Sequence, residues 1–359
     1  MWDIILEEGF TNATMAQEIF PRFHALNASK IYLYGSTKVG KSACALGIAH
    51  AFKHPIYIDG SDARLDFNAL KETLIKLHVE GRMDILIAKH CPKDIFLPPL
   101  EHIILIGYTP SAPKNFMSKS IWPLRFQEFA LLQKKEPNNT LLARFLKEGN
   151  LPETLHMPPT QRVRRKQEIY ALFLGNQLPI FKALLRFQSL SVTTHHLYIQ
   201  LKKILKISKD KLYEFMQFLQ ASQSILCVPP LESNLMSPKK LYFCDFALPY
   251  AFSHTHPLPP VFENMVALEL HQYFYQLFYE DSWLIGRRAT ETFCFLPWAF
   301  PTNLEARIDH LLKHCTFQIT HIYIITINFE GSGVINTRTY HAYSFTTFAL
   351  EILPTLLAN

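Results

Sequence analysis

The sequence predicts an α/β protein in which a parallel β-sheet domain is followed by two further domains. Three observations predict this class. Continuous apolar runs alternate with helix-favouring stretches, a glycine-containing loop joins the first run to the first helix, and a helix, helix, strand, strand order follows later in the chain. The 359 residues, of which 48% are hydrophobic and 18% charged, are enough for two or three folded cores.

The first loop carries the most specific motif of the chain. We predict a β-strand at residues 31–34 and a helix at residues 43–52, and the loop between them has the spacing G-x-x-x-x-G-K-[ST]. In such loops, backbone N–H groups cradle phosphates, the lysine reaches the terminal phosphates and the hydroxyl meets Mg²⁺. The predicted nucleotide-binding residues are Gly35, Ser36, Thr37, Lys38, Val39, Gly40, Lys41, Ser42 and Ala43, with Ser42 also holding Mg²⁺ through the nucleotide.

Three more apolar runs follow at residues 54–59, 83–88 and 102–107, and each is continuous rather than alternating. Strands that are buried on both faces of a parallel sheet have this pattern, and residues 68–78 suit a helical crossover between two of them. Polar and proline-containing segments interrupt the pattern between about 109 and 160. We therefore predict that the first domain occupies residues 1–150.

The middle of the chain has the element order of a winged helix. The predicted helices are residues 194–205 and 208–221, with Ser208 as the N-cap of the second, and the predicted strands are residues 225–228 and 241–245. Together with a preceding helical stretch, this segment is predicted to form a second domain at residues 151–254. A third, compact α/β domain is predicted at residues 255–359, beginning with a helix.

Lysines on the second helix and on the wing are candidate DNA contacts. They are Lys209, Lys211, Lys239 and Lys240. A solvated helix face explains the same residues equally well, because acidic residues interrupt the charge and no arginine is placed to bind guanine. A charge run at residues 162–166 is predicted to be an exposed helix start.

Composition limits the compartment and the partners. The net charge is +6, a mild excess that permits contact with acidic partners. The six cysteines form no C-x-x-C pair, so reduced thiols are expected. No run of 18 apolar residues occurs and no signal peptide is recognisable, so we expect a cytoplasmic protein without a membrane partner.

Several segments in this order resemble one family. Besides the loop, they are Ile103-Ile-Leu-Ile-Gly107, Trp122-Pro-Leu-Arg-Phe-Gln-Glu-Phe129, residues 207–226, Lys239-Lys-Leu-Tyr-Phe-Cys-Asp245 and residues 262–270. The chain resembles, over nearly its whole length, the bacterial and archaeal AAA-like P-loop ATPases whose C-terminal domain of unknown function has a restriction-endonuclease-like fold. The resemblance implies a P-loop ATPase domain that takes ATP and Mg²⁺, a winged helix and a nuclease-like domain.

Departures from the family pattern modify this expectation. Hydrolysis needs a carboxylate at the end of the strand beside the phosphate loop, where the family has Asp-Glu. The best matching strand, residues 85–87, is followed by Ala88-Lys89-His90 instead. Mg²⁺ would then rest on Ser42, phosphates, water and either Asp59 or Asp62, which are the candidate catalytic acids.

Three functions therefore remain open. The first is a nucleotide-responsive binding module with weak or no hydrolysis of ATP. The second is an active ATPase that uses a non-standard acid such as Asp59, and the third is a winged-helix DNA-binding protein with a relic P-loop. The expected partners are ATP, DNA or another protein.

Nuclease activity is not expected from the C-terminal segment. The family has Glu-x-Asp-Phe where this chain has Thr290-Glu-Thr-Phe293, and no Glu-x-Lys strand follows to complete a Mg²⁺ site. Glu291 is the remaining candidate acid there, and a solvated position at a strand edge explains it as well.

Overall fold

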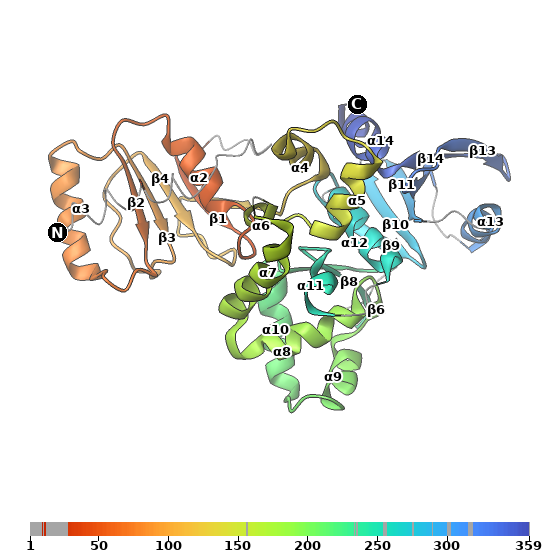
Figure 1. Ribbon diagram of the computed structural model, residues 1–359, viewed down its shortest axis with the longest axis horizontal. Coiled ribbons are helices and arrows are strands. Elements are labelled where there is room, and N and C mark those ends of the chain that lie inside the picture. The colour runs from red at the N-terminus through yellow and green to blue at the C-terminus, as the bar shows by residue number, and fades with distance from the viewer. Residues whose placement is uncertain are drawn as a thin grey trace. The chain divides into compact units, whose positions relative to one another are not determined.

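The computed structural model describes residues 9, 11, 28–155, 157–232, 234, 236–253, 257–274, 276–288, 290–299, 303–314 and 319–358 (Figure 1). The chain forms two compact units. The first comprises Met1–Pro123 with Ala221–Gln223, and the second comprises Leu124–Gln220 with Ser224–Asn359. The first unit thus ends before the predicted boundary at residue 150. The division of the remaining chain into two domains stays a prediction.

The first unit contains a five-stranded sheet in the order β2-β3-β4-β1-β5, and all its strand pairs are parallel. Four of its strands confirm the predicted apolar runs, with shifts of one or two residues at their ends. Its elements are β1 (Lys30–Tyr34), α2 (Lys41–Ala49), β2 (Pro55–Asp59), α3 (Phe67–Val79), β3 (Ile85–Lys89), β4 (His102–Ile106) and β5 (Met117–Ser120).

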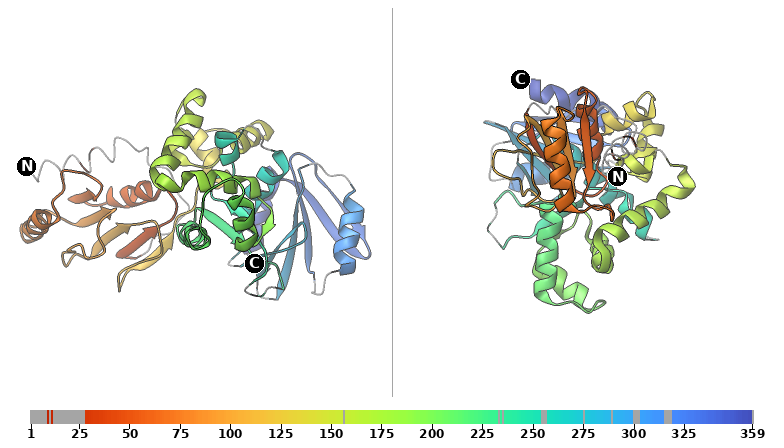
Figure 2. Two further views of the ribbon diagram at one scale, coloured as in Figure 1. Left: turned by 90° about the horizontal axis from the view of Figure 1, so that it is seen from below. Right: turned by 90° about the vertical axis from the view of Figure 1, so that its left-hand side faces the viewer.

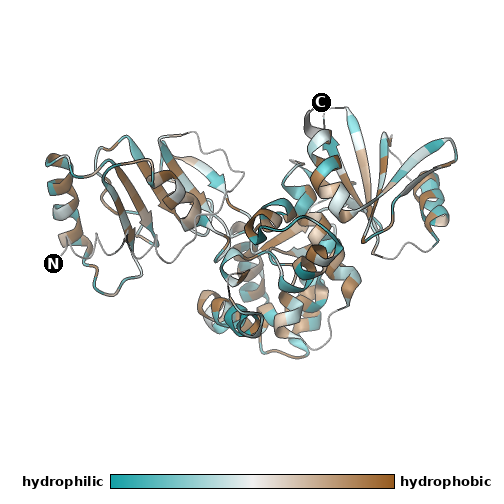
Figure 3. Cartoon of the chain, turned by 45° about the horizontal axis from the view of Figure 1, so that its top comes forward, coloured by the Kyte–Doolittle hydropathy of each residue, from teal (hydrophilic) through white to brown (hydrophobic). Residues whose placement is uncertain are grey.

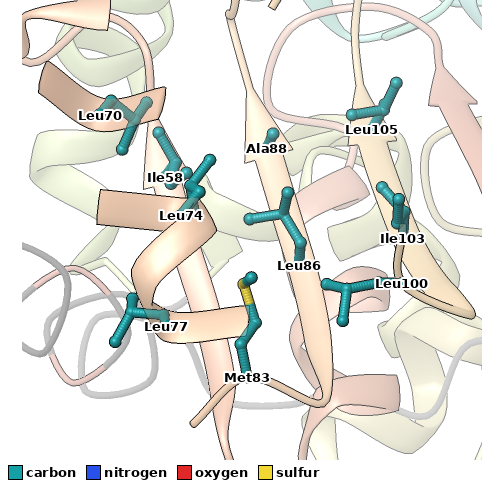
Figure 4. Close-up of a cluster of buried hydrophobic side chains, with 10 residues drawn as sticks. All are labelled: Ile58, Leu70, Leu74, Leu77, Met83, Leu86, Ala88, Leu100, Ile103 and Leu105. Carbon is teal, nitrogen blue, oxygen red and sulfur yellow. The ribbon is translucent and has the colours of Figure 1, made fainter. Parts of the chain in front are cut away.

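Helices cover both faces of this sheet, which explains why the apolar runs are continuous. Leu86 and Ala88 of β3 pack against Leu70 and Leu74 of α3 (Figure 4). The alternate positions of β3 point to the opposite face, where α2 contacts β3 and β4. Figure 3 accordingly shows these central strands in the hydrophobic colour. A strand with two buried faces has no place for polar side chains before its end.

The second unit is built from helices, a three-stranded sheet and a six-stranded sheet. Its helical elements are α4 (Phe126–Gln133), α5 (Asn139–Glu148), α6 (Pro152–Leu155), α7 (Pro159–Leu174), η1 (Gly175–Gln177), α8 (Leu178–Leu184), η2 (Leu185–Phe187), α9 (Thr194–Lys202), α10 (Lys209–Ala221), α11 (Leu248–Phe252), α12 (Leu258–His271), α13 (Leu304–His314), α14 (Phe345–Thr347), η3 (Phe348–Ile352) and α15 (Leu353–Ala358). Its strands are β6 (Ser191–Val192), β7 (Ile225–Val228), β8 (Lys239–Phe243), β9 (Leu277–Glu280), β10 (Trp283–Arg288), β11 (Glu291–Pro297), β12 (His321–Thr326), β13 (Gly331–Ile335) and β14 (Arg338–Ser344).

The predicted helix, helix, strand, strand order is present as α9, α10, β7 and β8. The two strands pair antiparallel, and β6 joins the other edge of β8. The Ser208 hydroxyl accepts a hydrogen bond from the backbone N–H of Lys211 at 3.3 Å, which confirms Ser208 as the cap of α10. The apolar face of α10, including Leu212 and Phe215, is buried.

The six-stranded sheet has the order β13-β14-β12-β11-β10-β9 and is mixed. Its central pairs, β11 with β12 and β12 with β14, are parallel, whereas the outer pairs are antiparallel. Helix α13 lies along one face and buries Ile308 and Leu311 against the sheet (Figure 2). Five cysteines among the described residues are free thiols, as expected. No described helix combines the length and the apolar character that crossing a membrane requires.

The charge run at the start of α7 is not the exposed feature that the sequence suggested. Lys166 and Arg162 are 4% and 9% exposed, respectively. The Lys166 ammonium donates to the fully buried Asp245 carboxylate, and Arg162 donates to the Met157 carbonyl at 2.8 Å. Every third or fourth residue of this helix faces inward, so the two ends of the run are buried while Arg164 stays exposed.

A second buried carboxyl group lies on α12. Glu269 is 3% exposed, and its Oε2 accepts a hydrogen bond from the Phe126 N–H at the start of α4, at 3.3 Å. Its Oε1 is buried and has no hydrogen-bond partner within the part of the chain that the structure describes. Burial raises the pKa of Glu269 to about 7, against the lowering effect of the Arg125 charge.

Glu269→Gln should remove the part of the pH dependence of the unfolding free energy that comes from the titration of Glu269. A folded pKa raised from 4.5 to about 7 means that protonation stabilises the fold at low pH and that this contribution is lost as pH rises through 7. Unfolding free energies from urea denaturation at pH 5 to 8 should therefore show the wild type losing roughly 3 kcal/mol relative to the variant. A constant difference across this range contradicts the assignment.

His271 also titrates, so the unfolding free energy of the wild type must be compared with that of Glu269→Gln at each pH. Burial lowers the pKa of His271 to about 4, so this group destabilises the fold as pH falls below 6.5, opposite in sign to Glu269. Both proteins contain His271, and its effect cancels in the difference. Glu136→Gln, at an exposed position, is the matched control and should follow the wild type at every pH.

Candidate phosphate-binding site

The loop between β1 and α2 has the backbone that a phosphate cradle requires. Gly35 and Gly40 have φ of 143° and 98°, in the range that favours glycine. Gly40 is the N-cap of α2, and the Cys44 N–H donates to its carbonyl at 3.0 Å, so the helix begins directly after the loop. The amides of a first helical turn have no partner within the helix and favour anions.

Lys41 is the first residue of α2 and is only 7% exposed. Its ammonium donates to the carbonyl oxygens of Gly35, at 2.7 Å, and Ser36. It also lies 5.0 Å from the centre of the Tyr108 ring, a cation–π distance. The lysine is thus held across the mouth of the loop by the loop itself.

Polar side chains gather at the carboxyl ends of β2 and β3. Asp59 ends β2, and its Oδ2 accepts from the Lys89 ammonium at 2.9 Å, while its Oδ1 lies 3.2 Å from His90 Nδ1. The same Oδ1 accepts from the Ser61 hydroxyl at 2.7 Å. Burial raises the pKa of Asp59, but the hydrogen bonds from His90, Lys89 and Ser61 outweigh burial and hold it well below its usual range.

Tyr108, which follows β4, connects this cluster to the loop. Its hydroxyl lies 2.9 Å from His90 Nε2, and the two rings stack with centroids 5.2 Å apart. The same tyrosine also hydrogen-bonds to Thr37 of the loop, and burial raises its pKa. A chain of contacts therefore runs from Thr37 through Tyr108 and His90 to Asp59.

The strand that was expected beside the phosphate loop lies one position further away. β4 pairs directly with β1, and β3 pairs with the far edge of β4. The prediction that residues 85–87 lie next to the loop strand is therefore wrong. Neither strand ends in an acid, since β4 is followed by Gly107 and Tyr108 and β3 ends in Lys89.

The residues at this edge do not fit Mg²⁺. The ion prefers about six oxygen ligands, usually one or two of them carboxylates. The Ser42 hydroxyl donates to Tyr57 and keeps its lone pairs, but it is a single oxygen ligand. Both oxygens of Asp59 are engaged by cationic or hydroxyl donors. Asp62 is paired with Arg64 at 2.8 Å, which lowers the pKa of Asp62 to about 2. Among the described residues no group of three His, Cys, Asp or Glu could hold a metal ion.

The candidate DNA contacts differ in exposure. Lys209 and Lys211 of α10 and Lys239 of β8 are exposed. Lys240 is 5% exposed, and its ammonium donates to Glu263 Oε1 at 2.9 Å. Lys240 is therefore not on the surface with the other three, because alternate residues of a strand point to opposite faces.

Glu291, the acid noted in the C-terminal segment, is the first residue of β11. Its Oε1 lies 3.1 Å from His321 Nε2 of the neighbouring strand, and both side chains are partly exposed. The contact is a surface pair between two strands.

Sequence reasoning identified the loop but missed Tyr108 and the partners of Asp59. A signal was available, because the carboxyl ends of parallel strands meet at one edge of a sheet and ligands bind there. Applied to the predicted strands, this rule brings residues 59, 89–90 and 108 together. It does not reveal that Lys89 and His90 would pair with Asp59.

The parallel sheet, the loop and the helix that starts at Lys41 define a P-loop ATPase-like α/β fold for the first unit. No protein-family model and no curated protein matches the chain. Among solved structures, it is similar to the Walker-type ATPase PABY2304 of Pyrococcus abyssi, with 13% identity over 63% of this chain and 91% of that one and a TM-score of 0.42. It is also similar to the Aeropyrum pernix ORC1 protein in complex with DNA, with 14% identity over 68% and 91% and a TM-score of 0.28.

Gly35→Ala should disrupt the first unit more than Gly81→Ala, because, of the two, only Gly35 is closely packed against another segment. A Cβ at Gly35 would lie 2.3 Å from the Ile121 carbonyl oxygen, and the φ of 143° is unfavourable for alanine. We expect a loss of roughly 2–4 kcal/mol. Gly81→Ala is the matched control, since φ is also positive but no atom lies within 4 Å, and it should cost about 1 kcal/mol. Equal losses in thermal unfolding contradict the role of the Ile121 contact.

Proposed function

We propose that the first unit binds ATP in the loop at residues 35–43 and hydrolyses it weakly or not at all, as a nucleotide-responsive binding module. The observation that carries this proposal is the geometry of the loop. Gly40 has a left-handed backbone conformation and is the N-cap of α2. The Lys41 ammonium lies at the open side of the loop, where it and the first amides of the helix can bind the same phosphate.

Binding is supported by electrostatics that do not depend on a catalytic acid. The positive end of the α2 dipole, the loop amides and the Lys41 ammonium all favour a polyphosphate. A phosphate would replace the carbonyl oxygens of Gly35 and Ser36 as the acceptor for Lys41. Charge-assisted hydrogen bonds of this kind are stronger than those to neutral carbonyls, so the exchange favours the ligand.

Weak hydrolysis is supported by the state of Asp59, the leading candidate acid. Its Oδ2 is already paired with the Lys89 ammonium and its Oδ1 already contacts His90, so it is poorly suited to orient an attacking water. Losing one electrostatic catalytic group typically lowers the rate by about a hundred- to a thousandfold. Binding and cleavage are thereby separate properties of this site.

ATP should raise the melting temperature of the full chain, and Lys41→Ala should abolish the shift. At about 100 times the dissociation constant, the ligand adds roughly 2.7 kcal/mol of stability, which corresponds to a shift of several degrees. The measurement is thermal unfolding with and without ATP, together with phosphate release. Lys53→Ala, an exposed lysine beyond the far end of α2, is the matched control and should keep the shift.

The Lys41 result needs a check on folding, because Lys41 is buried and bonded to the loop. The ligand-free melting temperature of Lys41→Ala shows whether the unit is still folded, and Lys41→Arg keeps the charge if it is not. Sustained phosphate release that is lost in both Lys41→Ala and Asp59→Ala contradicts the binding-module proposal and supports an active ATPase. No shift with any nucleotide contradicts nucleotide binding altogether.

A second candidate function is DNA binding by the α9 to β8 segment. It is favoured by a set of exposed lysines, namely Lys202, Lys203, Lys206, Lys209, Lys211 and Lys239. Exposed ammonium groups on a second helix and a hairpin suit contacts to a phosphate backbone. Asp210 and Glu214 lie on the same helix, so contacts of this kind would be sequence-independent and weak.

Duplex DNA retention should fall steeply with salt if this segment binds DNA. Replacing both Lys209 and Lys211 by alanine should lower the slope of log affinity against log salt by about 1.8, since each phosphate contact contributes about 0.9. Fluorescence anisotropy at several salt concentrations measures this slope. A Lys134→Ala, Lys135→Ala double variant removes two exposed lysines elsewhere in the second unit and should leave it unchanged. An identical slope in both double variants contradicts the assignment.

A further inference from the structure

The carboxyl edge of the first sheet holds more positive than negative charge. Lys41 begins α2 directly after the loop, and Lys89 ends β3. The Asp59 carboxylate pairs with Lys89 and also contacts His90. The Lys89 ammonium donates to Asp59 Oδ2 at 2.9 Å.

Lys89 lies near the phosphate loop because parallel strands end at the same edge of the sheet. β3, which ends in Lys89, is separated from β1 by β4 alone. Contacts run from Lys89 to Asp59, from Asp59 to His90 and from His90 to Tyr108, whose ring centre lies 5.0 Å from the Lys41 ammonium. Lys89 is therefore a second cation at the edge where the phosphate loop begins.

We propose that this site binds a nucleoside triphosphate without a divalent cation, with the Lys89 ammonium supplying the positive charge that a metal ion would otherwise supply. The inference rests on the proposed function, since it concerns the same loop. Asp59 holds Lys89 at the end of β3 while no ligand is present, and the phosphates then compete with Asp59 for the ammonium. This arrangement explains why the oxygen ligands at this edge do not fit Mg²⁺, because the Lys89 ammonium would repel a metal cation.

Isothermal titration of the full chain with ATP, once in Mg²⁺ and once in EDTA, tests the inference. We expect dissociation constants that agree within about threefold, a difference of less than about 0.7 kcal/mol. Binding in Mg²⁺ that weakens more than about tenfold in EDTA overturns the inference and leaves the proposed function intact. Absence of binding in both conditions overturns the proposed function itself, so the two failures are distinct.

Variants of the ion pair give a second test. Lys89→Met should weaken binding in EDTA about tenfold, because it removes a charge-assisted hydrogen bond and keeps the length of the side chain. Asp59→Asn should strengthen binding in EDTA, because it releases Lys89. Lys93→Ala, an exposed lysine four residues further on, is the control and should change nothing.

Asp59→Asn also decides the result if Lys89→Met does not fold, since asparagine keeps the size of the side chain and a carbonyl acceptor. If Asp59 instead holds a metal ion for the nucleotide, Asp59→Asn will weaken binding in Mg²⁺, whatever its effect in EDTA. That outcome overturns the inference. A gain of affinity in EDTA without a loss in Mg²⁺ supports it, because a metal ligand cannot be removed without weakening binding in Mg²⁺.

Discussion

Parallel pairing of the strands in the first unit is the constraint on which the candidate site depends. Because β1 to β4 all run in the same direction, the residues that follow them converge at one edge. The phosphate loop follows β1, Asp59 ends β2, Lys89 and His90 end β3 and follow it, and Tyr108 follows β4. The side chains at this edge come from four separate segments, whereas in an antiparallel sheet neighbouring strands would end at opposite edges.

The charges at this edge separate binding from cleavage. Lys41 and Lys89 each carry one positive charge and Asp59 carries one negative charge. These three side chains together have a net charge of +1, which favours a polyanion. The same pairing deprives Asp59 of the free carboxylate that would position water or a metal ion. Under the proposed function, the loop would bind phosphates while the neighbouring strand ends offer no free carboxylate for cleavage.

Local patterns in the sequence predicted what depends on neighbouring residues. The helix start after the Gly35–Ser42 loop and the Ser208 cap of α10 each depend on residues within one loop or turn. The structure contains both, as predicted. Partners that lie far apart in the chain were not predictable. Lys166 is buried because Asp245 lies beside it in the fold, and Lys240 turns inward towards Glu263. The order of β3 and β4 likewise follows from long-range pairing, which no local pattern records.

Lys41 would couple the proposed ligand to the fold, because its ammonium bonds to the loop carbonyls. These bonds close the loop and satisfy a buried charge, so they stabilise the cradle in the shape that a phosphate needs. A ligand must exchange them, and its net gain is the difference between bonds to phosphate and bonds to carbonyls. The Asp59 to Lys89 pair imposes the same exchange at the end of β3. Under the proposed function, the affinity for phosphate would depend on how strongly the protein holds these two ammonium groups, and weakening those bonds would tighten binding.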